Sequence, residues 1–223
     1  INIKKVIHLV YKFKLDMKKF YNKKYNYISK FFNDYKNNIF DILALTSIDN
    51  LTKAASMIEK KILSNSNIFV CGNGGSAAIA NHYICDFLKG LRTGTNLKPK
   101  FFSLATNVET ISAIANDISY SEIFRYQLES LSKSNDLVIF VSSSGNSPNI
   151  KKALDYCVKN KISSIGFCGF GGGYLKKNST IPVHVSSNNY GIIEDAHHIL
   201  MHTLLQFLRQ KNMQKNKIKK FKF

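Results

Sequence analysis

Five short apolar runs, each followed by small or polar residues, constrain the fold of this chain more than any other feature. They are NIFVCG (67–72), KFFSLAT (100–106), DLVIFVSSSG (136–145), SSIGFCG (163–169) and IPVHVSS (181–187), and helical stretches separate most of them. A continuous apolar run is typical of a parallel strand that is buried on both faces of its sheet. The alternation of strand and helix therefore predicts a three-layer α/β sandwich.

A helical region is expected before the first of these strands. Residues 17–62 are predicted to be helical, because apolar side chains recur at three- and four-residue spacing over 27–43 and again over 51–62. Ser47 or Asp49 is placed to cap the second of these helices.

The chain is long enough to form one domain with a substantial core. A closing helix is expected over about 192–210, so residues 17–210 are predicted to form that domain. We interpret residues 1–16 as an extension or a disordered terminus, and residues 211–223 as a basic C-terminal tail.

The net charge of +18 is concentrated at the two ends of the chain. Residues 1–36 carry ten Lys and two Asp, and residues 209–223 carry six Lys and one Arg without an acidic residue. The remaining 172 residues carry 15 basic and 12 acidic groups, so the predicted core is close to neutral. Basic ends could bind polyanions weakly and in a salt-dependent way, but we expect no dedicated nucleic-acid partner.

Membrane insertion and disulfide bonding are not expected either. No apolar run approaches the roughly 20 residues that a membrane helix requires. The four cysteines, at positions 71, 85, 157 and 168, show neither a CxxC pair nor metal-ligand spacing. We interpret them as buried free thiols of a reducing compartment, and the expected location is the cytoplasm.

The glycine turn after the first apolar run predicts a ligand-binding loop. Residues 72–77 match the dinucleotide pattern G-x-G-x-x-A. That fold also needs an acidic residue at the end of the second strand. Here the second strand ends in Ala105-Thr106, and Glu109 follows three residues too late. The turn is therefore expected to direct backbone N–H groups at an anion or at polar oxygens, without a nucleotide cofactor.

A cluster of hydroxyl groups follows the most apolar strand. Ser142, Ser143, Ser144 and Ser147 surround Gly145 at a strand-to-helix turn that contains no Lys or Arg. Ser147 and Pro148 would suffice to start the helix, which leaves three serines without a structural explanation. Hydroxyls, backbone amides and a helix N-terminus together suit a phosphate group.

Two helical segments each place imidazole and carboxylate groups on one face. Glu194, His198 and His202 follow one another at four-residue spacing, with His197 three residues after Glu194, and His82 precedes Asp86 by four residues. Such pairs serve either proton transfer or a divalent metal ion, and the spacing alone leaves both alternatives open.

Together these motifs resemble the sugar-isomerase (SIS) domain family and, more narrowly, its phosphoheptose isomerase branch. The resemblance rests on GNGGSAAIANHYICDF (72–87), AIAND (113–117), VSSSGNSPN (141–149) and IIEDAHHILMH (192–202), and it covers about residues 20–208. It implies a flavodoxin-like α/β/α sandwich around a five-stranded parallel sheet, with extra N-terminal helices. It also implies a homotetramer with active sites between the subunits.

The activity implied by the resemblance is an aldose–ketose isomerisation through an enediol(ate). The substrate would be sedoheptulose 7-phosphate, converted to D-glycero-D-manno-heptose 7-phosphate on the way to the heptose of bacterial surface glycans. Some members of the family hold a zinc ion, so the resemblance admits one Zn²⁺ per subunit.

Site residues follow from the same resemblance. The sugar contacts would be Asn73, Gly74, Gly75, His82, Asn116, Asp117 and Glu194, and the phosphate contacts Ser142, Ser143, Ser144 and Ser147. The catalytic residues would be Asp86, Glu194 and His202, and these three with His82 would form the metal-binding set. We assign the base to the pair of carboxylates, with Glu194 as the first to test, and the acid to His202.

Two positions depart from the pattern of the family. Asp86 stands where the family commonly has Glu, and Glu194 stands where it commonly has Gln. The first change shortens a side chain and the second adds a carboxylate, so the base and the substrate are the points most affected. Two alternatives follow: a non-catalytic phosphosugar-binding or adaptor protein of the replication-initiator-associating type, and an isomerase of another phosphosugar.

Overall fold

A computed structural model of the chain describes residues 23–219, so the extension expected over residues 1–16 lies outside the described part. The strands are β1 (Asn67–Gly72), β2 (Lys100–Ser103), β3 (Leu137–Ser142), β4 (Ser163–Cys168) and β5 (Ile181–His184). The helices are α2 (Ile28–Ala44), α3 (Ile48–Leu63), α4 (Gly75–Cys85), α5 (Val108–Asp117), α6 (Arg125–Leu131), α7 (Pro148–Lys159), α8 (Gly173–Asn178), α9 (Tyr190–Asn212) and α10 (Lys215–Ile218). A π-helix, η1 (Asp86–Leu91), continues α4, and a 3₁₀ turn, η2 (Tyr120–Glu122), follows α5. All five predicted strands are confirmed.

The strands form one parallel sheet in the order β2-β1-β3-β4-β5. This is the strand order of flavodoxin-like folds, in which ligands bind where the order reverses, between the first and third strands. Gly72 at the end of β1 lies opposite Val141 near the end of β3. The loops that follow these two strands therefore start side by side.

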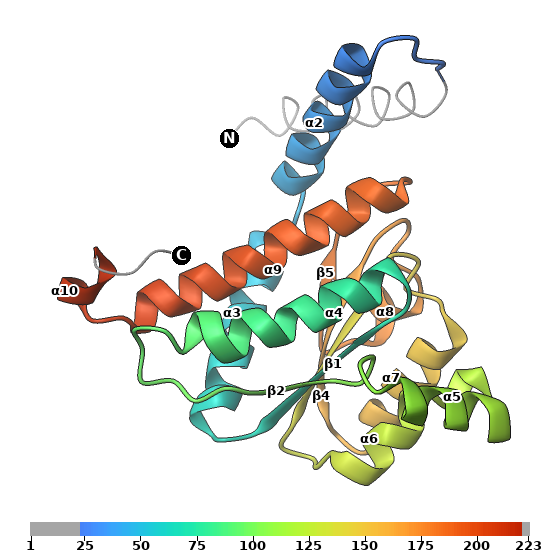
Figure 1. Cartoon of the computed structure of the whole chain (residues 1–223), viewed down its shortest axis with the longest axis vertical. Coiled ribbons are helices and arrows are strands. Elements are labelled where there is room, and N and C mark those ends of the chain that lie inside the picture. Colours follow the sequence, from blue (N-terminus) through green and yellow to red (C-terminus); the bar gives the residue numbers. More distant parts are fainter. Residues whose placement is uncertain (1–22, 220–223) are drawn as a thin grey trace.

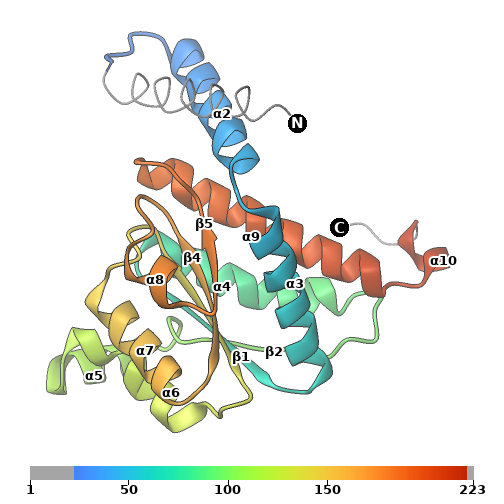
Figure 2. The same cartoon turned by 180° about the vertical axis from the view of Figure 1, so that it is seen from behind.

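Helices cover both faces of the sheet (Figures 1 and 2). Along β1, Ile68 and Val70 enter the core beneath α3, α4 and α9, whereas Phe69 and Cys71 enter the core on the side of α5, α6 and α7. Both cores are apolar, so each central strand must be apolar on both faces, which explains the continuous apolar runs.

The predicted N-terminal helical region consists of α2 and α3. Ser47, one of the two predicted caps, accepts a hydrogen bond from the backbone N–H of Asn50 at the start of α3. Helix α2 projects beyond the α/β body (Figure 1). Of the earlier residues predicted to be helical, 17–22 lie outside the described part and 23–27 precede the helix.

Helix α9 ends two residues later than predicted, at Asn212. Its last turn packs against α3, where Lys211 forms an ion pair with Glu59 at 2.6 Å and Asn212 donates to the same carboxylate at 2.8 Å. Met213 is buried. The first residues of the predicted basic tail therefore belong to the packed body.

Three of the four cysteines are buried as predicted, but the prediction is wrong for Cys85, which is exposed. Cys85 lies two residues after the buried Tyr83 on α4. Two residues correspond to about 200° around an α-helix, so Cys85 faces away from the core. No helix within residues 23–219 is long and apolar enough to cross a membrane.

Candidate active site

The glycine turn after β1 brings two backbone segments into close approach. A Cβ at Gly72 would lie 2.6 Å from the carbonyl oxygen of Ser76 and 2.8 Å from that of Val141. Gly74, with a φ of 54°, directly precedes α4. Glycine is required at both positions, at the first for space and at the second for conformation. The N-terminus of α4 therefore lies at the carboxyl end of β1.

Asn73 joins this turn to the segment that follows β3. Its amide exchanges two hydrogen bonds with the amide of Asn149, each 2.9 Å long. The hydroxyl of Tyr120 donates at 3.1 Å to the side-chain oxygen of Asn73, which also accepts from Asn149. These bonds hold the amide in one orientation. Asn149 and Tyr120 were not predicted as site residues, because their only signal is a partner on a different loop.

The serine loop between β3 and α7 is tightly folded. Gly145 has a φ of 64°, and its N–H donates to the carbonyl oxygen of Ser142 at 3.1 Å. A Cβ at Gly145 would collide with the carbonyl oxygen of Gly172, so the loop packs directly on the turn before α8. Ser147 occupies the N-cap position of α7 and Pro148 the first helical position, as expected, yet the hydroxyl of Ser147 makes no capping hydrogen bond in this helix.

The hydroxyls of the serine loop differ in their partners. Ser142 Oγ accepts a hydrogen bond from the N–H of Gly145, and Ser144 Oγ accepts one from the N–H of Asn146, both at 3.2 Å. Ser143 Oγ is buried and has no hydrogen-bond partner among residues 23–219. A buried hydroxyl without a partner is destabilising, and a bound oxyanion would supply the missing partner.

Asp86 lies between two imidazoles where α4 passes into η1. Its Oδ1 is 3.4 Å from Nε2 of His82, and its Oδ2 is 3.2 Å from Nε2 of His202 on α9. One ligand atom from each of the three residues lies within 4.8 Å of the other two. The side chains of His82 and His202 are 42% and 40% exposed, so the cluster is accessible to solvent. The short side chain of Asp86 therefore reaches both imidazoles.

His198 extends this cluster to a third imidazole. Its Nε2 is 3.4 Å from Nδ1 of His82, and its ring lies nearly parallel to that of His202, with a centroid separation of 6.0 Å. Burial, followed by the neighbouring imidazoles of His82 and His202, lowers the pKa of His198. The sequence indicated that His198 shares a face with Glu194 and His202, but it did not indicate contact with His82.

Glu194 lies apart from this cluster. Its carboxylate rests against Gly75, where an added Cβ would lie 2.5 Å from Oε2. The group of potential metal ligands found within residues 23–219 contains His82, Asp86 and His202 but not Glu194. Burial, followed by the charge of Asp195, raises the pKa of Glu194. The structure thus brings together three members of the expected metal-binding set and places the fourth at the N-terminus of α4.

A pocket of about 270 Å³ opens beside the three-residue cluster. Asp86 and His202 line it together with Lys89, Gln206 and other residues of η1 and α9. A solvent-accessible pocket at this position gives a small polar molecule access to the carboxylate and the imidazole.

Asn116 and Asp117 end α5, and both are exposed. The amide of Asn116 donates to the carboxylate of Asp117 at 2.8 Å. Tyr120 follows three residues later and contacts Asn73, which brings this segment to the glycine turn.

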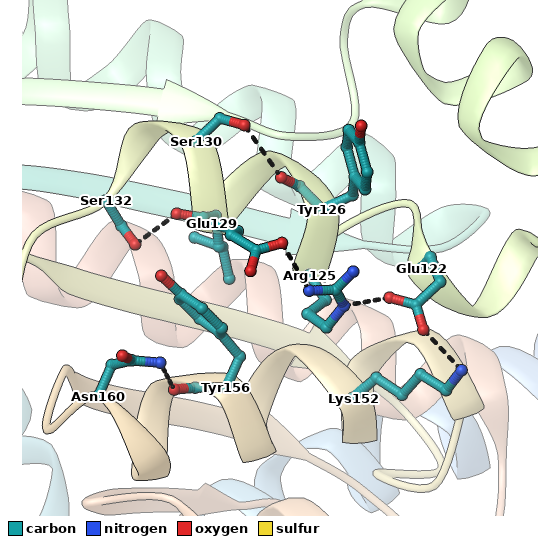
Figure 3. A network of polar contacts seen from close by, with 10 residues as sticks. Glu122, Arg125, Tyr126, Glu129, Ser130, Ser132, Lys152, Tyr156 and Asn160 are labelled. Carbon is teal, nitrogen blue, oxygen red and sulfur yellow. Dashed lines mark hydrogen bonds and ion pairs between the residues drawn. The ribbon is translucent and has the colours of Figure 1, made fainter. Parts of the chain in front are cut away.

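A network of charged side chains holds η2, and with it Tyr120, against α6 and α7 (Figure 3). The carboxylate of Glu122 accepts hydrogen bonds from Arg125 and, at 2.7 Å, from Nζ of Lys152. Arg125 also donates to Glu129 at 2.8 Å. The hydrogen bond from Arg125, followed by that from Lys152, lowers the pKa of Glu122. This ion-pair network anchors η2, whose first residue, Tyr120, contacts Asn73.

His197 belongs to the core although it adjoins the site in sequence. Its side chain is fully buried, and its ring meets Phe167 edge-on at a centroid separation of 5.8 Å. Burial lowers the pKa of His197 to about 4, so the ring is neutral at physiological pH.

A flavodoxin-like sheet with amide and hydroxyl donors in both switch-point loops is the architecture of a protein that binds a small polar ligand at its strand ends. The chain belongs to the SIS domain family, whose model matches residues 30–169.

Similar proteins include several phosphoheptose isomerases. The chain is 34% identical over 159 residues to the phosphoheptose isomerase of Shewanella denitrificans, and the alignment covers 70% of this chain and 81% of the relative. It is 33% identical over 169 residues to a probable phosphoheptose isomerase of Thermoplasma acidophilum, with coverage of 74% and 90%. The solved structure of a phosphoheptose isomerase from Francisella tularensis matches with a TM-score of 0.72 at 25% identity, covering 82% of this chain and 96% of that one.

Proposed function

We propose that this chain is an aldose–ketose isomerase of phosphosugars, and that its ketose substrate is sedoheptulose 7-phosphate. The reaction class is supported by the relatives, which are phosphoheptose isomerases. Among the chain's own residues, the observation that carries the proposal is the contact of Asp86 with His202 at 3.2 Å, a carboxylate and an imidazole placed as a base and an acid. The aldose product would be D-glycero-D-manno-heptose 7-phosphate.

The serine loop would hold the phosphate. Ser143 presents a buried hydroxyl without a partner among residues 23–219, and the N-terminus of α7 follows directly. Hydroxyls and a helix N-terminus stabilise a dianion without a basic side chain. Binding energy gained at the phosphate, which does not react, can be used to hold the open sugar chain in line with the acid and the base.

Asp86 and His202 would carry out the proton transfers. The carboxylate of Asp86 removes a proton from C1 of the ketose, which forms an enediolate. The proton on Asp86 exchanges with solvent, and Asp86 then delivers a proton to C2. His202 donates a proton to the former carbonyl oxygen at C2 and accepts the proton of the hydroxyl at C1, so the aldose forms without net loss of protons. The sequence favoured Glu194 as the first base to test. Its position at Gly75, two turns of α9 before His202, supports a role in holding the sugar instead.

A zinc ion fits the residues at this cluster. Two ligand atoms at the usual Zn–N or Zn–O distance of a tetrahedral ion are about 3.3 Å apart. Asp86 contacts His82 through Oδ1 at 3.4 Å and His202 through Oδ2 at 3.2 Å, and one ligand atom from each of the three residues lies within 4.8 Å of the other two. His82, Asp86 and His202 would hold the ion, and three protein ligands are typical of catalytic zinc sites. When bound, the ion would supply Lewis-acid polarisation of the sugar oxygens. Asp86 and His202 would then be its ligands, so the proton transfers described above belong to the site without an ion.

We expect the chain to form a homotetramer with its active sites between the subunits. Helix α2 and its N-cap residue Tyr27 expose several large apolar side chains, namely Tyr27, Ile28, Phe32 and Phe40, at 61% or more of their surface. An apolar helix face of this kind is typical of a protein–protein interface. In addition, the glycine turn and Asp86 lie at opposite ends of α4, about 16 Å apart along its axis. In an active site shared between subunits, the glycine turn of one subunit would lie closer to Asp86 of another subunit than to its own Asp86.

Isotope exchange tests the proposed reaction. The purified chain is incubated in D₂O with sedoheptulose 7-phosphate and, in parallel, with other ketose phosphates, with chelator or with added zinc. Formation of the aldose with deuterium at C2 is the expected result. Asp86→Asn and His202→Asn should abolish turnover, whereas Glu194→Gln should mainly raise KM. If Glu194→Gln abolishes turnover and Asp86→Asn does not, the two carboxylates have the opposite roles.

The same experiment distinguishes the non-catalytic alternative. A phosphosugar-binding or adaptor protein would bind the sugar without introducing deuterium. Mixed tetramers of Ser143→Ala and Asp86→Asn chains then test the shared site: a component with the KM of the wild type appears in the mixture only where the serine loop and the cluster of one site come from different subunits.

A further inference from the structure

His198 lies between Glu194 and His202 on α9. Its side chain is half-buried and approaches His82 on α4. Its Nε2 lies 3.4 Å from Nδ1 of His82. The two rings meet nearly edge-on, with centroids 5.3 Å apart and planes inclined by 67°. His198 is therefore placed on the far side of the His82 ring from Asp86, which contacts the opposite nitrogen.

The two ring nitrogens of His82 have different partners: Nε2 faces Asp86 and Nδ1 faces His198. Nε2 faces Asp86 at 3.4 Å, on the side of the expected ion. A nitrogen that binds a metal ion must present a lone pair, so the single proton of a neutral His82 has to reside on Nδ1. That proton then points at Nε2 of His198, which must accept it with its own proton on Nδ1.

We propose that His198 is a positioning residue for His82: it accepts a hydrogen bond from Nδ1–H and so holds Nε2 of His82 as a lone pair directed at Asp86 and His202. This inference rests on the metal site proposed above. Among residues 23–219, His198 is the hydrogen-bond partner that the structure provides for this nitrogen. Partners of this kind fix the tautomer and the ring orientation of a metal-binding histidine, and their loss typically weakens metal binding about 10- to 100-fold.

Metal titration of the full-length chain tests the proposal. Co²⁺ is added to the metal-free protein and followed by its visible absorption, and Zn²⁺ affinity is measured by competition with a chromogenic chelator. Four variants are compared with the wild type: His198→Ala, His198→Gln, Ile199→Ala and His82→Ala. Ile199 neighbours His198 on the exposed side of α9 and serves as the control for the helix. Circular dichroism verifies that each variant is folded.

We expect His198→Ala to weaken metal binding roughly 10- to 100-fold. His198→Gln, whose side-chain oxygen can accept the same hydrogen bond, should recover most of the affinity, and Ile199→Ala should leave it unchanged. Nitrogen NMR of the imidazoles should show His82 protonated at Nδ1 in the wild type and a mixture of tautomers in His198→Ala.

The possible failures are distinguishable. If the wild type binds neither ion, the proposed metal site is wrong, while the NMR experiment still decides whether His198 sets the tautomer of His82. If the wild type binds metal and His198→Ala binds it equally well, the positioning role is overturned and the metal site stands. If His198→Ala loses as much affinity as His82→Ala and Gln does not restore it, His198 is a ligand and the positioning role is also overturned.

Discussion

The carboxylate of Glu194 lies against the α-carbon of Gly75, so closely that a methyl group there would stand 2.5 Å from Oε2 and 2.6 Å from Oε1. Gly75 is the first residue of α4, and the N-terminus of a helix favours a negative charge. Glycine at this position therefore leaves the space that the carboxylate fills. Since the two residues are 119 positions apart, this contact couples the beginning of α4 to the beginning of α9.

Gly75→Ala should displace the carboxylate of Glu194 and impair the enzyme more than its fold. In the proposed function Glu194 holds the sugar, and a misplacement of the substrate by about 1 Å can reduce catalysis by roughly 100-fold, so we expect kcat/KM to fall roughly 10- to 100-fold. Gly171→Ala is the matched control, because a Cβ at Gly171 would meet nothing within 4 Å. Steady-state kinetics and thermal unfolding of both variants provide the test, and equal kinetics would show that the position of Glu194 is unimportant.

Glu194→Gln should stabilise the protein increasingly as the pH rises. Burial, followed by the charge of Asp195, raises the pKa of Glu194 above its ordinary 4.5. Between these two pKa values the folded chain binds more protons than the unfolded chain, so this residue lowers the free energy of unfolding as the pH increases through that window. Urea unfolding of the wild type and the variant, from below pH 4.5 to neutral pH, measures the difference. A difference that shrinks with rising pH would contradict the raised pKa.

The fold could be predicted because the signals for it are local. Continuous apolar runs require strands with two covered faces, and the glycine and serine turns mark the carboxyl ends of the strands, where ligands bind in folds of this class. The contact of Asn73 with Asn149 joins the glycine turn to the start of α7, directly after the serine loop. Cys85 was mispredicted because an apolar run can continue onto the exposed face of a helix.

The arrangement of the candidate site could be predicted only in part. Four-residue spacing places Glu194, His198 and His202 on one face of α9, but it does not determine which residue of α4 each one meets. That depends on the axial alignment of the two helices, which is set by packing along their whole length. The alignment places Glu194 at Gly75, His198 at His82 and His202 at Asp86. The family resemblance therefore implied one four-residue set where the structure has two separate groups.

His197 should make the folded chain sensitive to acid. Burial lowers its pKa from 6.5 to about 4. Between these values the unfolded chain binds the additional proton, so the free energy of unfolding decreases as the pH falls through this window, by roughly 3 kcal/mol in total. In His197→Leu this part of the pH dependence should disappear, whatever the change in stability at neutral pH. Chemical denaturation at a series of pH values measures the slope, and an unchanged slope in the variant would rule out His197 as its source.

Ser143→Ala and Ser164→Ala should have opposite effects. Ser143 Oγ is buried without a hydrogen-bond partner among residues 23–219, so its loss should leave stability unchanged or raise it. If it binds the phosphate, its removal costs a hydrogen bond to a charged group, and KM should rise roughly 10-fold or more with little change in kcat. Ser164 Oγ is buried and accepts a hydrogen bond from the N–H of Thr180 at 3.0 Å. Ser164→Ala should therefore cost about 1 kcal/mol of stability or more without affecting KM.

Inorganic phosphate provides a direct check as a competitive inhibitor, since its inhibition constant should rise in Ser143→Ala and not in Ser164→Ala. A variant at Ser143 that loses stability but keeps its KM would assign this hydroxyl to the fold and not to the substrate.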